Sequence, residues 1–444
     1  MISFNTRDEY QRKPIAEKVI TLLASDIAVS PMVIDGGWGT GKTEFCLKLI
    51  DLIDTSDPKP FIPIYVDAFK ADHADQPLMT LLAAVLEKLP DSDSKTTLKQ
   101  KAIPMLRFGM KTAGKAALSW LLKANPDDLA EGMQDEIKNA GNNAIDHSVE
   151  ALLEDHIEAE KNLQTLRSAL EKVASEQPIV LFVDELDRCR PDFAVALLEV
   201  IKHIFDVEGV KFVLITNTQQ LKAAINHSYG NDVDAQRYLD KFLAFKLNLP
   251  TKVKVDYQSE DCSVQHFKML IAESPTLNAS TLKKLDYGHV GTLCYLIRIH
   301  RRSLREVETL IRYLEVYQKL CNGLKEDIIF GFALFKAIGV YIYTFESILS
   351  ENIVSKKLDG NDLLTCFGIE SIELLDTEEY RGWITDVLRM LGRECSTNFE
   401  QFIIKDEQTT ISFKQAKQNY FKGERAPDRI FSIIEDSIRK MMLQ

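Results

Sequence analysis

The feature that most constrains this chain is a short glycine-rich run that completes the pattern GxxxxGK[ST]. It lies between an apolar run at residues 32–35 and a stretch with helical spacing that begins at Lys42. Glycines let backbone N–H groups turn inward around phosphates, and the following helix adds the positive end of its dipole. The pattern therefore predicts a phosphate-binding loop, in which Lys42 reaches the β- and γ-phosphates and the Thr43 hydroxyl ligates Mg²⁺. The expected nucleotide-binding residues are Gly36, Gly37, Trp38, Gly39, Thr40, Gly41, Lys42 and Thr43.

A second motif ends the apolar run at residues 179–184 with two adjacent carboxylates, Asp184 and Glu185. At a strand end beside the phosphate loop, Asp184 is expected to hold Mg²⁺ through water, and Glu185 to deprotonate the attacking water. The alternative is a strand followed by a solvated acidic turn. The Asp-Glu pair favours ATP over GTP, because GTPases normally lack this glutamate and read guanine with an NKxD motif that the sequence does not contain. We therefore expect ATP and Mg²⁺ as cofactors.

A third candidate is Asn217, which follows the apolar run at residues 211–216. In NTPases with this order of motifs, the same position carries a polar sensor that contacts the γ-phosphate or the attacking water. The alternative is an ordinary turn residue, since Asn is common where strands end.

The order of apolar runs predicts the fold class. Five short runs, most of them separated by helical patterns, indicate an α/β fold with a parallel sheet covered by helices on both faces. The gap between the second and third runs is too long for one crossover, so residues 95–165 are expected to form a helical insertion. We expect an NTPase core over residues 1–250 and a mainly helical domain over residues 251–444, where strand signals fade. The five runs cover residues 32–35, 61–67, 179–184, 211–216 and 245–249.

The expected insertion begins with a basic segment, residues 101–123, which has five basic residues, no acidic residue and several large apolar ones. Its charges prevent it from spanning a bilayer, but it could lie on an anionic surface. A second apolar stretch, residues 328–345, carries Lys336 at its centre and is expected to form a buried core helix instead of a membrane span.

Composition limits the remaining classes. The net charge of −12 argues against a surface that binds nucleic acid everywhere, although a local basic patch remains compatible with it. Seven cysteines without a CxxC pair are expected to be reduced, buried thiols. The first residues carry charges where a signal peptide needs an apolar core. We expect a cytoplasmic protein that is at most peripheral at the inner membrane face.

Four segments together resemble the KAP family of P-loop NTPases over roughly residues 7–315. They are GGWGTGKT, YVDAFKADHADQPL, VDELDRCRP and RYLDKF. The resemblance implies an ATPase fold with strand order 5-1-4-3-2, an insertion between the two nucleotide-binding motifs and a trailing helical region. The family's insertion often carries transmembrane helices, whereas lysines break the apolar runs here.

The resemblance also implies further site residues. Asp187 and Arg188 are expected to modulate the site near Glu185, with a structural ion pair as the alternative. Arg237, with Lys241 nearby, lies where related ATPases present a cation to the γ-phosphate of a neighbour or of their own site. A later cluster resembles a sensor arginine on a helical lid, or else a solvated helix face paired with acidic residues. The cluster consists of Arg298, Arg301, Arg302 and Arg305.

Together these features predict an ATP-hydrolysing switch or remodelling subunit. The family resemblance adds a role in bacterial defence against phage, with protein partners of unknown identity. A homo-oligomer is expected on chemical grounds, because the two motifs provide only Lys42 and Mg²⁺ to offset the charge on the γ-phosphoryl group. Two alternatives remain, a nucleic-acid-stimulated motor and a scaffold ATPase associated with a membrane surface. A scaffold without catalysis is disfavoured because Lys42, Thr43, Asp184 and Glu185 are all present.

Overall fold

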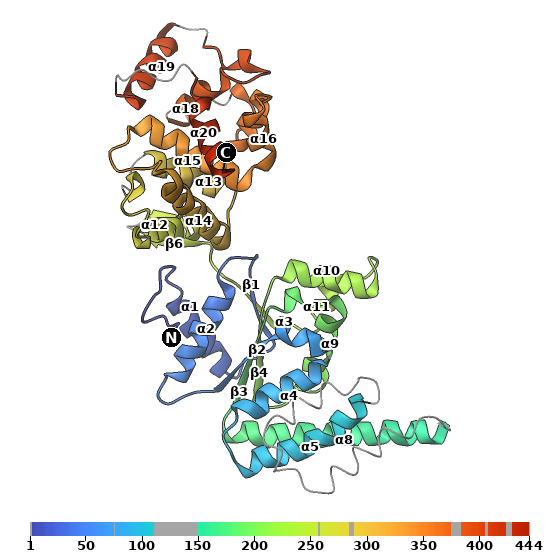
Figure 1. The fold of residues 1–444 in the computed structure, drawn as a ribbon. Helices are drawn as coiled ribbons and strands as arrows, with labels where there is room; N and C mark the ends of the chain where they lie inside the picture. The colour runs from blue at the N-terminus through green and yellow to red at the C-terminus, as the bar shows by residue number, and fades with distance from the viewer. Residues whose placement is uncertain are drawn as a thin grey trace. The chain divides into compact units, whose positions relative to one another are not determined.

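The computed structural model describes residues 2–74, 76–110, 149–255, 258–283, 288–373, 383–404, 407–422 and 429–443. The chain divides into two compact units, Met1–Leu249 and Pro250–Gln444 (Figure 1). The first contains the sheet and the phosphate-binding loop, and the second is built mainly of helices.

The first unit is built on a five-stranded parallel sheet with the order β2-β3-β4-β1-β5. This is the order 5-1-4-3-2 that the family resemblance implies, and it confirms the α/β fold class. The strands are β1 (Met32–Asp35), β2 (Ile62–Asp67), β3 (Ile179–Asp184), β4 (Val210–Thr216) and β5 (Phe245–Asn248).

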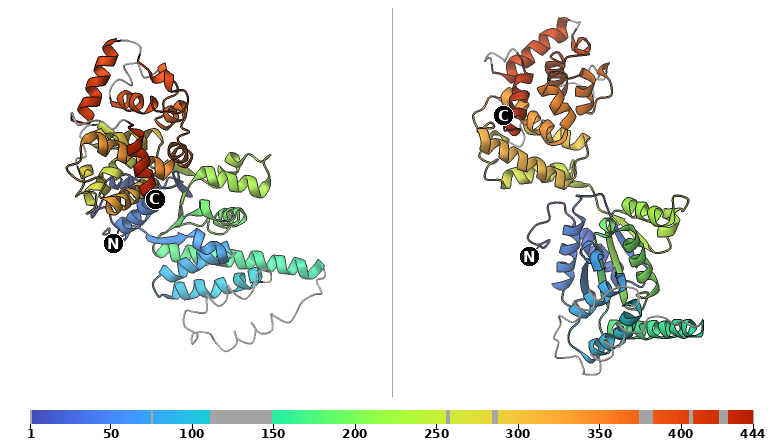
Figure 2. Two further views of the ribbon diagram at one scale, coloured as in Figure 1. Left: turned by 45° about the horizontal axis from the view of Figure 1, so that its top comes forward. Right: turned by 45° about the vertical axis from the view of Figure 1, so that its right-hand side comes forward.

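Helices cover both faces of this sheet (Figure 2). All six residues of β3 are buried, because alternate side chains enter two different cores. Val180 and Phe182 pack with α1 and α2, whereas Leu181 packs with helices on the opposite face. The first face carries α1 (Lys13–Ala24) and α2 (Lys42–Asp54). The opposite face carries α4 (Pro77–Lys88), α5 (Asp93–Met110), α8 (Val149–Glu176), α9 (Pro191–His203), α10 (Thr218–Tyr229) and α11 (Ala235–Leu239).

The ends of the expected insertion belong to the core of the first unit. Leu98 of α5 and Leu166 and Leu170 of α8 are fully buried in the same cluster as the sheet residues. This anchors both helices on the sheet. Most of the basic segment, residues 111–123, lies outside the described residues.

The second unit contains one feature that the sequence did not predict, a short antiparallel hairpin. It pairs β6 (Lys252–Val255) with β7 (Gln258–Asp261). KVKV alternates polar and apolar residues as a half-buried strand does, but it is only four residues long, and QSED contains no apolar residue, so the apolar signal is weak here. The rest of the unit consists of α12 (Cys262–Glu273), α13 (Gly288–Ile299), α14 (Leu304–Cys321), α15 (Phe330–Phe345), α16 (Ser347–Val354), α17 (Gly360–Cys366), α18 (Trp383–Gly392), α19 (Glu407–Tyr420) and α20 (Phe431–Met441), with short 3-10 turns.

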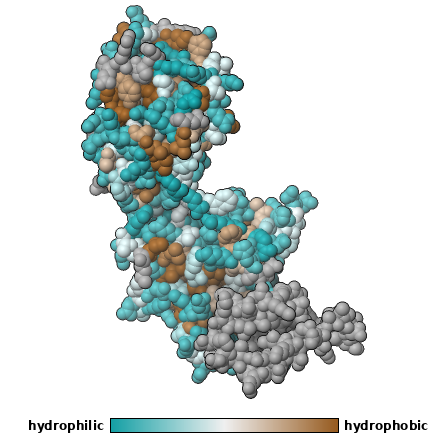
Figure 3. Space-filling model, viewed as in Figure 1, coloured by the Kyte–Doolittle hydropathy of each residue, from teal (hydrophilic) through white to brown (hydrophobic). Residues whose placement is uncertain are grey.

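Helix α15 confirms the prediction of a buried core helix. Ten of its residues are buried, and Lys336 Nζ donates a hydrogen bond of 3.1 Å to the Gly323 carbonyl. The helical pattern at residues 327–349 divides into α15 and α16, because Glu346 leaves the helical conformation with φ −119° and ψ 68°. Across the described parts of the chain, no helix combines the length and apolar character that a bilayer crossing requires. On the face drawn in Figure 3, hydrophilic and apolar residues alternate over each unit.

Candidate nucleotide site

The phosphate-binding loop connects β1 to α2 and carries Lys42 at the start of the helix. Lys42 Nζ donates to the carbonyls of Gly36, at 2.7 Å, and Gly37, at 2.9 Å. Gly41 has φ +78°, a left-handed conformation that favours glycine, and a Cβ on Gly36 would lie 2.8 Å from Thr40 Oγ1. The loop therefore needs glycine both for its turns and for its close packing.

Asp184 ends β3 as a buried carboxylate that is held by several donors. Its Oδ2 accepts a hydrogen bond of 3.1 Å from Tyr65 Oη, and its Oδ1 accepts one of 2.8 Å from the backbone N–H of Glu185. Burial raises the pKa of Asp184, and hydrogen bonds from Thr43, Glu185 and Tyr65 oppose the shift only in part. These contacts orient the carboxylate before any ligand arrives.

The residues suit a magnesium ion that is bound together with a nucleotide. The Thr43 side chain interacts with Asp184 directly, so a hydroxyl and a carboxylate oxygen lie side by side. Within the described residues, no group of three or more His, Cys, Asp or Glu side chains forms a metal site. Phosphate oxygens and water would have to supply the remaining ligands, as is usual for Mg²⁺.

Glu185 has a strained backbone at the end of β3, with φ +60°. Its Oε1 lies 3.0 Å from an NH2 of Arg188 in an ion pair. Burial raises the pKa of Glu185, Arg188 lowers it, and the neighbouring Asp184 raises it again. The arrangement provides a carboxylate with raised basicity, which a general base requires, and Arg188 restrains it.

Asp187 joins two other elements of the site. Its Oδ2 accepts a hydrogen bond of 2.7 Å from Trp38 Nε1, and its Oδ1 accepts one of 3.2 Å from Thr216 Oγ1. The Asn217 side chain instead caps α10, because its Oδ1 accepts from the backbone N–H of Gln219 at 3.1 Å. The Thr216 hydroxyl, next to the residue that the sequence singled out, is thus the polar group of β4 that contacts Asp187.

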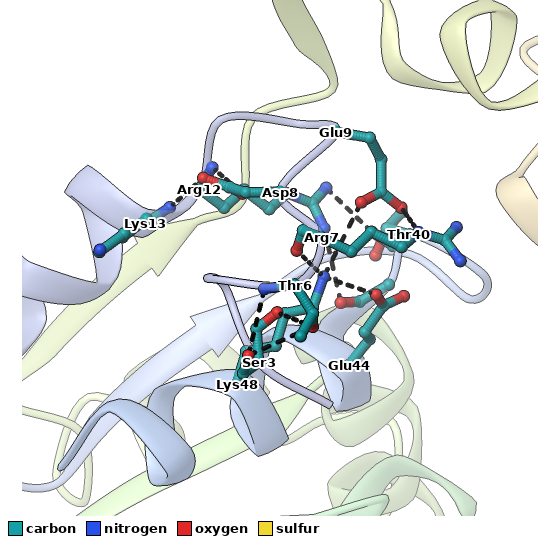
Figure 4. A network of polar contacts seen from close by, with 11 residues as sticks. Ser3, Thr6, Arg7, Asp8, Glu9, Arg12, Lys13, Thr40, Glu44 and Lys48 are labelled. Carbon is teal, nitrogen blue, oxygen red and sulfur yellow. Dashed lines mark hydrogen bonds and ion pairs between the residues drawn. The ribbon is translucent and has the colours of Figure 1, made fainter. Parts of the chain in front are cut away.

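The N-terminal segment contacts the phosphate-binding loop, a feature that sequence reasoning missed (Figure 4). Arg12 is buried and donates to the carbonyl of Thr40 at 3.0 Å and to that of Gly41 at 3.5 Å. Lys48 of α2 donates to the Arg7 carbonyl at 2.7 Å and pairs with Glu44 at 2.8 Å. An arginine shortly before a phosphate-binding loop is too common a pattern to reveal this contact in advance.

Two of the quoted motifs contact each other through one ion pair. Arg190 of VDELDRCRP donates its backbone N–H and its Nε to the carboxylate of Asp72, both at 3.0 Å. It also donates to the Asp72 carbonyl at 2.7 Å. Asp72 belongs to YVDAFKADHADQPL, so this contact braces the segment after β2 against the segment after β3.

The candidate arginines differ in their surroundings. Arg237 on α11 has a side chain that is 86% exposed, and its nearest acidic partner, Asp234, lies 3.3 Å away. In the second unit, Arg298 pairs with Asp261 at 3.1 Å. Arg302 pairs with Glu306 at 3.0 Å and with Glu346 at 2.8 Å. Arg301 and Arg305 are exposed. The interpretation of the cluster as paired structural arginines therefore fits Arg298 and Arg302 better than the interpretation as lid sensors.

Comparisons with known proteins agree with this geometry. A search of curated proteins finds no match. The family model described as KAP family P-loop domain matches residues 12–321, which is well over half of the chain. The match includes the phosphate-binding loop, the Asp184 strand end, the Arg237 helix and the first helices of the second unit. The chain therefore belongs to the KAP family of P-loop NTPases.

Proposed function

We propose that this protein binds ATP with Mg²⁺, hydrolyses it to ADP and phosphate, and uses the nucleotide state as a switch or to remodel a partner. The observation that carries the proposal is the meeting of three groups from two distant motifs: Lys42 and Thr43 lie beside Asp184 at the ends of β1 and β3. Glu185 follows directly, where a catalytic base is needed. The adjacent carboxylates favour ATP over GTP.

Each side chain has a stated task in this proposal. Lys42 offsets charge on the β- and γ-phosphates, and its two carbonyl partners, Gly36 and Gly37, must release it when phosphates bind. Thr43 and Asp184 would hold Mg²⁺, which supplies further positive charge to the transferred phosphoryl group. Glu185 takes a proton from the attacking water, and this requires its carboxylate to leave Arg188.

Two variants test the proposal. Lys42→Ala should abolish ATP binding in calorimetry, because it removes the loop's side-chain cation. Glu185→Gln should keep ATP binding while phosphate release falls by about 10²- to 10⁴-fold, because the amide keeps the shape and loses the base. Competition between ATP and GTP for binding to the Glu185→Gln protein tests whether the site prefers adenine to guanine. Undiminished ATP affinity in Lys42→Ala, or near-normal turnover in Glu185→Gln, would contradict the assignment.

The two alternative functions call for separate measurements. A nucleic-acid motor would use exposed cations, and acidic partners already engage Arg298 and Arg302. Adding DNA or RNA to the hydrolysis assay should therefore leave the rate unchanged. The membrane-surface alternative depends on residues 101–123, and extraction from membranes by high salt would indicate peripheral binding.

The role in defence against phage rests on the family resemblance. It predicts that host cells lose protection in a plaque assay when they carry Lys42→Ala in place of the wild-type protein. Equal plaque counts with the variant and with the wild type would remove this part of the proposal.

A further inference from the structure

Trp38 lies in the phosphate-binding loop, and its side chain makes a specific contact. Its side chain is 54% exposed, yet the indole N–H donates to Asp187 Oδ2 at 2.7 Å. The two residues are 149 positions apart in the sequence. A large apolar side chain in such a loop is therefore held by one charge-assisted hydrogen bond to the segment after β3.

Asp187 connects this bond to two other parts of the site. Its second oxygen accepts from Thr216 Oγ1 at the buried end of β4, at 3.2 Å. It also lies near Lys42: burial lowers the pKa of Lys42, and Asp187 is the foremost of the carboxylates that oppose this shift. The Asp187 carboxylate thus contacts the phosphate-binding loop and β4, and it lies near Lys42, the cation that is expected to contact the phosphates.

The arrival of a γ-phosphate changes the charges around Asp187. The lysine of a phosphate-binding loop contacts the β- and γ-phosphates, so a bound γ-phosphate adds negative charge beside the cation that Asp187 also lies near. Like charges at short range repel in a partly buried site. ADP has no γ-phosphate, so its binding brings less negative charge near Asp187.

We propose that Trp38 and Asp187 form a positioning pair that distinguishes nucleoside triphosphate from diphosphate. The hydrogen bond between Trp38 and Asp187 is stable without a γ-phosphate and weakens when one binds. Its loss lets the part of the loop around Trp38 move and alters the hydrogen bond between Asp187 and Thr216. This inference rests on the proposed ATPase function and deepens it, because it names the part of the nucleotide that the pair reads.

Thermodynamic linkage predicts in which direction the ratio of ATP to ADP affinity changes when the bond is removed. If the Trp38–Asp187 bond stabilises the state without a γ-phosphate, its removal must favour the triphosphate state. Trp38→Phe keeps a ring and removes the donor, so we expect the ratio of ATP to ADP affinity to rise by roughly 10-fold, the scale of one hydrogen bond to a charged group. Asp187→Asn removes the repelling charge and should change the ratio in the same direction. If the bond were merely structural, its removal would weaken the binding of ATP and of ADP equally, or would change neither.

The experiment uses the full chain with Glu185→Gln, so that ATP persists during the measurement. The chain has three tryptophans, and Trp120→Phe with Trp383→Phe leaves Trp38 as the only tryptophan whose emission is recorded. This background is its own control, since its ATP and ADP affinities should match those of the parent in calorimetry. We expect Trp38 emission to change with Mg·ATP and to stay near its nucleotide-free value with Mg·ADP.

The outcomes separate the two proposals. If both nucleotides bind and the emission is the same with each, the positioning pair is wrong and the ATPase proposal stands. An unchanged affinity ratio in both Trp38→Phe and Asp187→Asn would equally overturn the pair. If calorimetry detects no nucleotide binding at all, the proposed function fails, and the pair fails with it.

Discussion

The two units use their charged residues in different ways. In the first unit, Lys42 comes from one part of the chain and Asp184 and Asp187 from another, and they meet at the carboxyl edge of one sheet, where burial shifts the pKa of Lys42 and Asp184. In the second unit, Arg302 and Glu306 lie at the start of one helix and satisfy each other there. The first unit thus gathers charges at the proposed nucleotide site, whereas this pair of the second unit caps and braces the start of a helix.

The buried residues of the two units differ in the same way. Lys42 and Asp184 are buried against strands that are apolar on both faces, a placement that costs stability unless a ligand or a partner compensates. The second unit's core cluster is built from apolar residues of its helices, such as Leu310 and Ile338. Changes at the polar edge should therefore affect turnover, and changes in the helical core should affect folding.

The largest expected effect concerns the cation that completes the active site. Arg237→Ala should lower the hydrolysis rate by about 10³-fold or more, the scale measured for arginines that stabilise the transferred phosphoryl group. Its exposed side chain favours action on a neighbouring copy. Mixing Arg237→Ala with Glu185→Gln should then restore activity, because some interfaces combine an intact Glu185 with an intact Arg237.

The control variant is Gln236→Ala, an exposed neighbour of Arg237 on α11 whose Nε2 donates to Asp240 at 2.6 Å. It should retain most of the rate. A mixture that stays inactive, although both variants bind ATP and associate in light scattering, would show that Arg237 acts within its own chain or only supports the fold.

The next effect tests the helical core. Leu310→Ala removes a fully buried side chain of α14 and should destabilise the second unit by about 2–5 kcal/mol in urea unfolding. Leu320→Ala, on the same helix but 51% exposed, is the matched control and should be nearly neutral. We expect hydrolysis to stay within a few-fold of wild type at a temperature where both variants are folded. A large loss of turnover in folded Leu310→Ala would break the comparison.

A smaller effect separates structural arginines from sensors. Arg302→Gln loses its ion pairs with Glu306 and Glu346, so it should lower the stability of the second unit by about 2 kcal/mol. Its side chain is 15% exposed, which keeps the expected loss below that of a fully buried pair. Arg305→Gln, exposed and close by, should change neither stability nor rate. If Arg302→Gln instead lost turnover at unchanged stability, it would belong to the nucleotide site.

The smallest effect depends on pH. Burial alone would raise the pKa of Glu306, but hydrogen bonds from Ser303 and the contact with Arg302 prevail and hold it below its ordinary value of 4.5. Because the folded-state pKa is the lower one, the stabilisation is complete above the unfolded pKa and is lost as the pH falls through the folded pKa. Glu306→Gln should therefore cost about 1 kcal/mol at neutral pH, the scale of one helix cap, and nothing in acid below that pKa.

Urea unfolding at neutral and at acidic pH measures this difference, with the exposed Glu351→Gln as control. A loss of the same size at both pH values would show that the shape of Glu306, and not its charge, caps α14.

Sequence patterns predicted the parts of this protein that depend on neighbours in the chain. The phosphate-binding loop is contiguous, so its glycines and Lys42 were identified directly. The five apolar runs located the strands, because burial on both faces leaves a continuous apolar signal, as in β3. The order of the strands followed from the family resemblance. The hairpin of β6 and β7 was missed because it is half exposed and polar.

The sequence by itself thus determined the fold class, the loop and the two carboxylates, since each of these is encoded by residues next to one another. Only the tertiary structure decided which side chains meet: Trp38 with Asp187, Asp72 with Arg190, and Arg12 with the loop carbonyl of Thr40. Asp72 and Arg190, for example, are separated by 118 positions. Such contacts follow from how strands and helices pack, and packing depends on the whole chain, whereas a motif depends on a few residues.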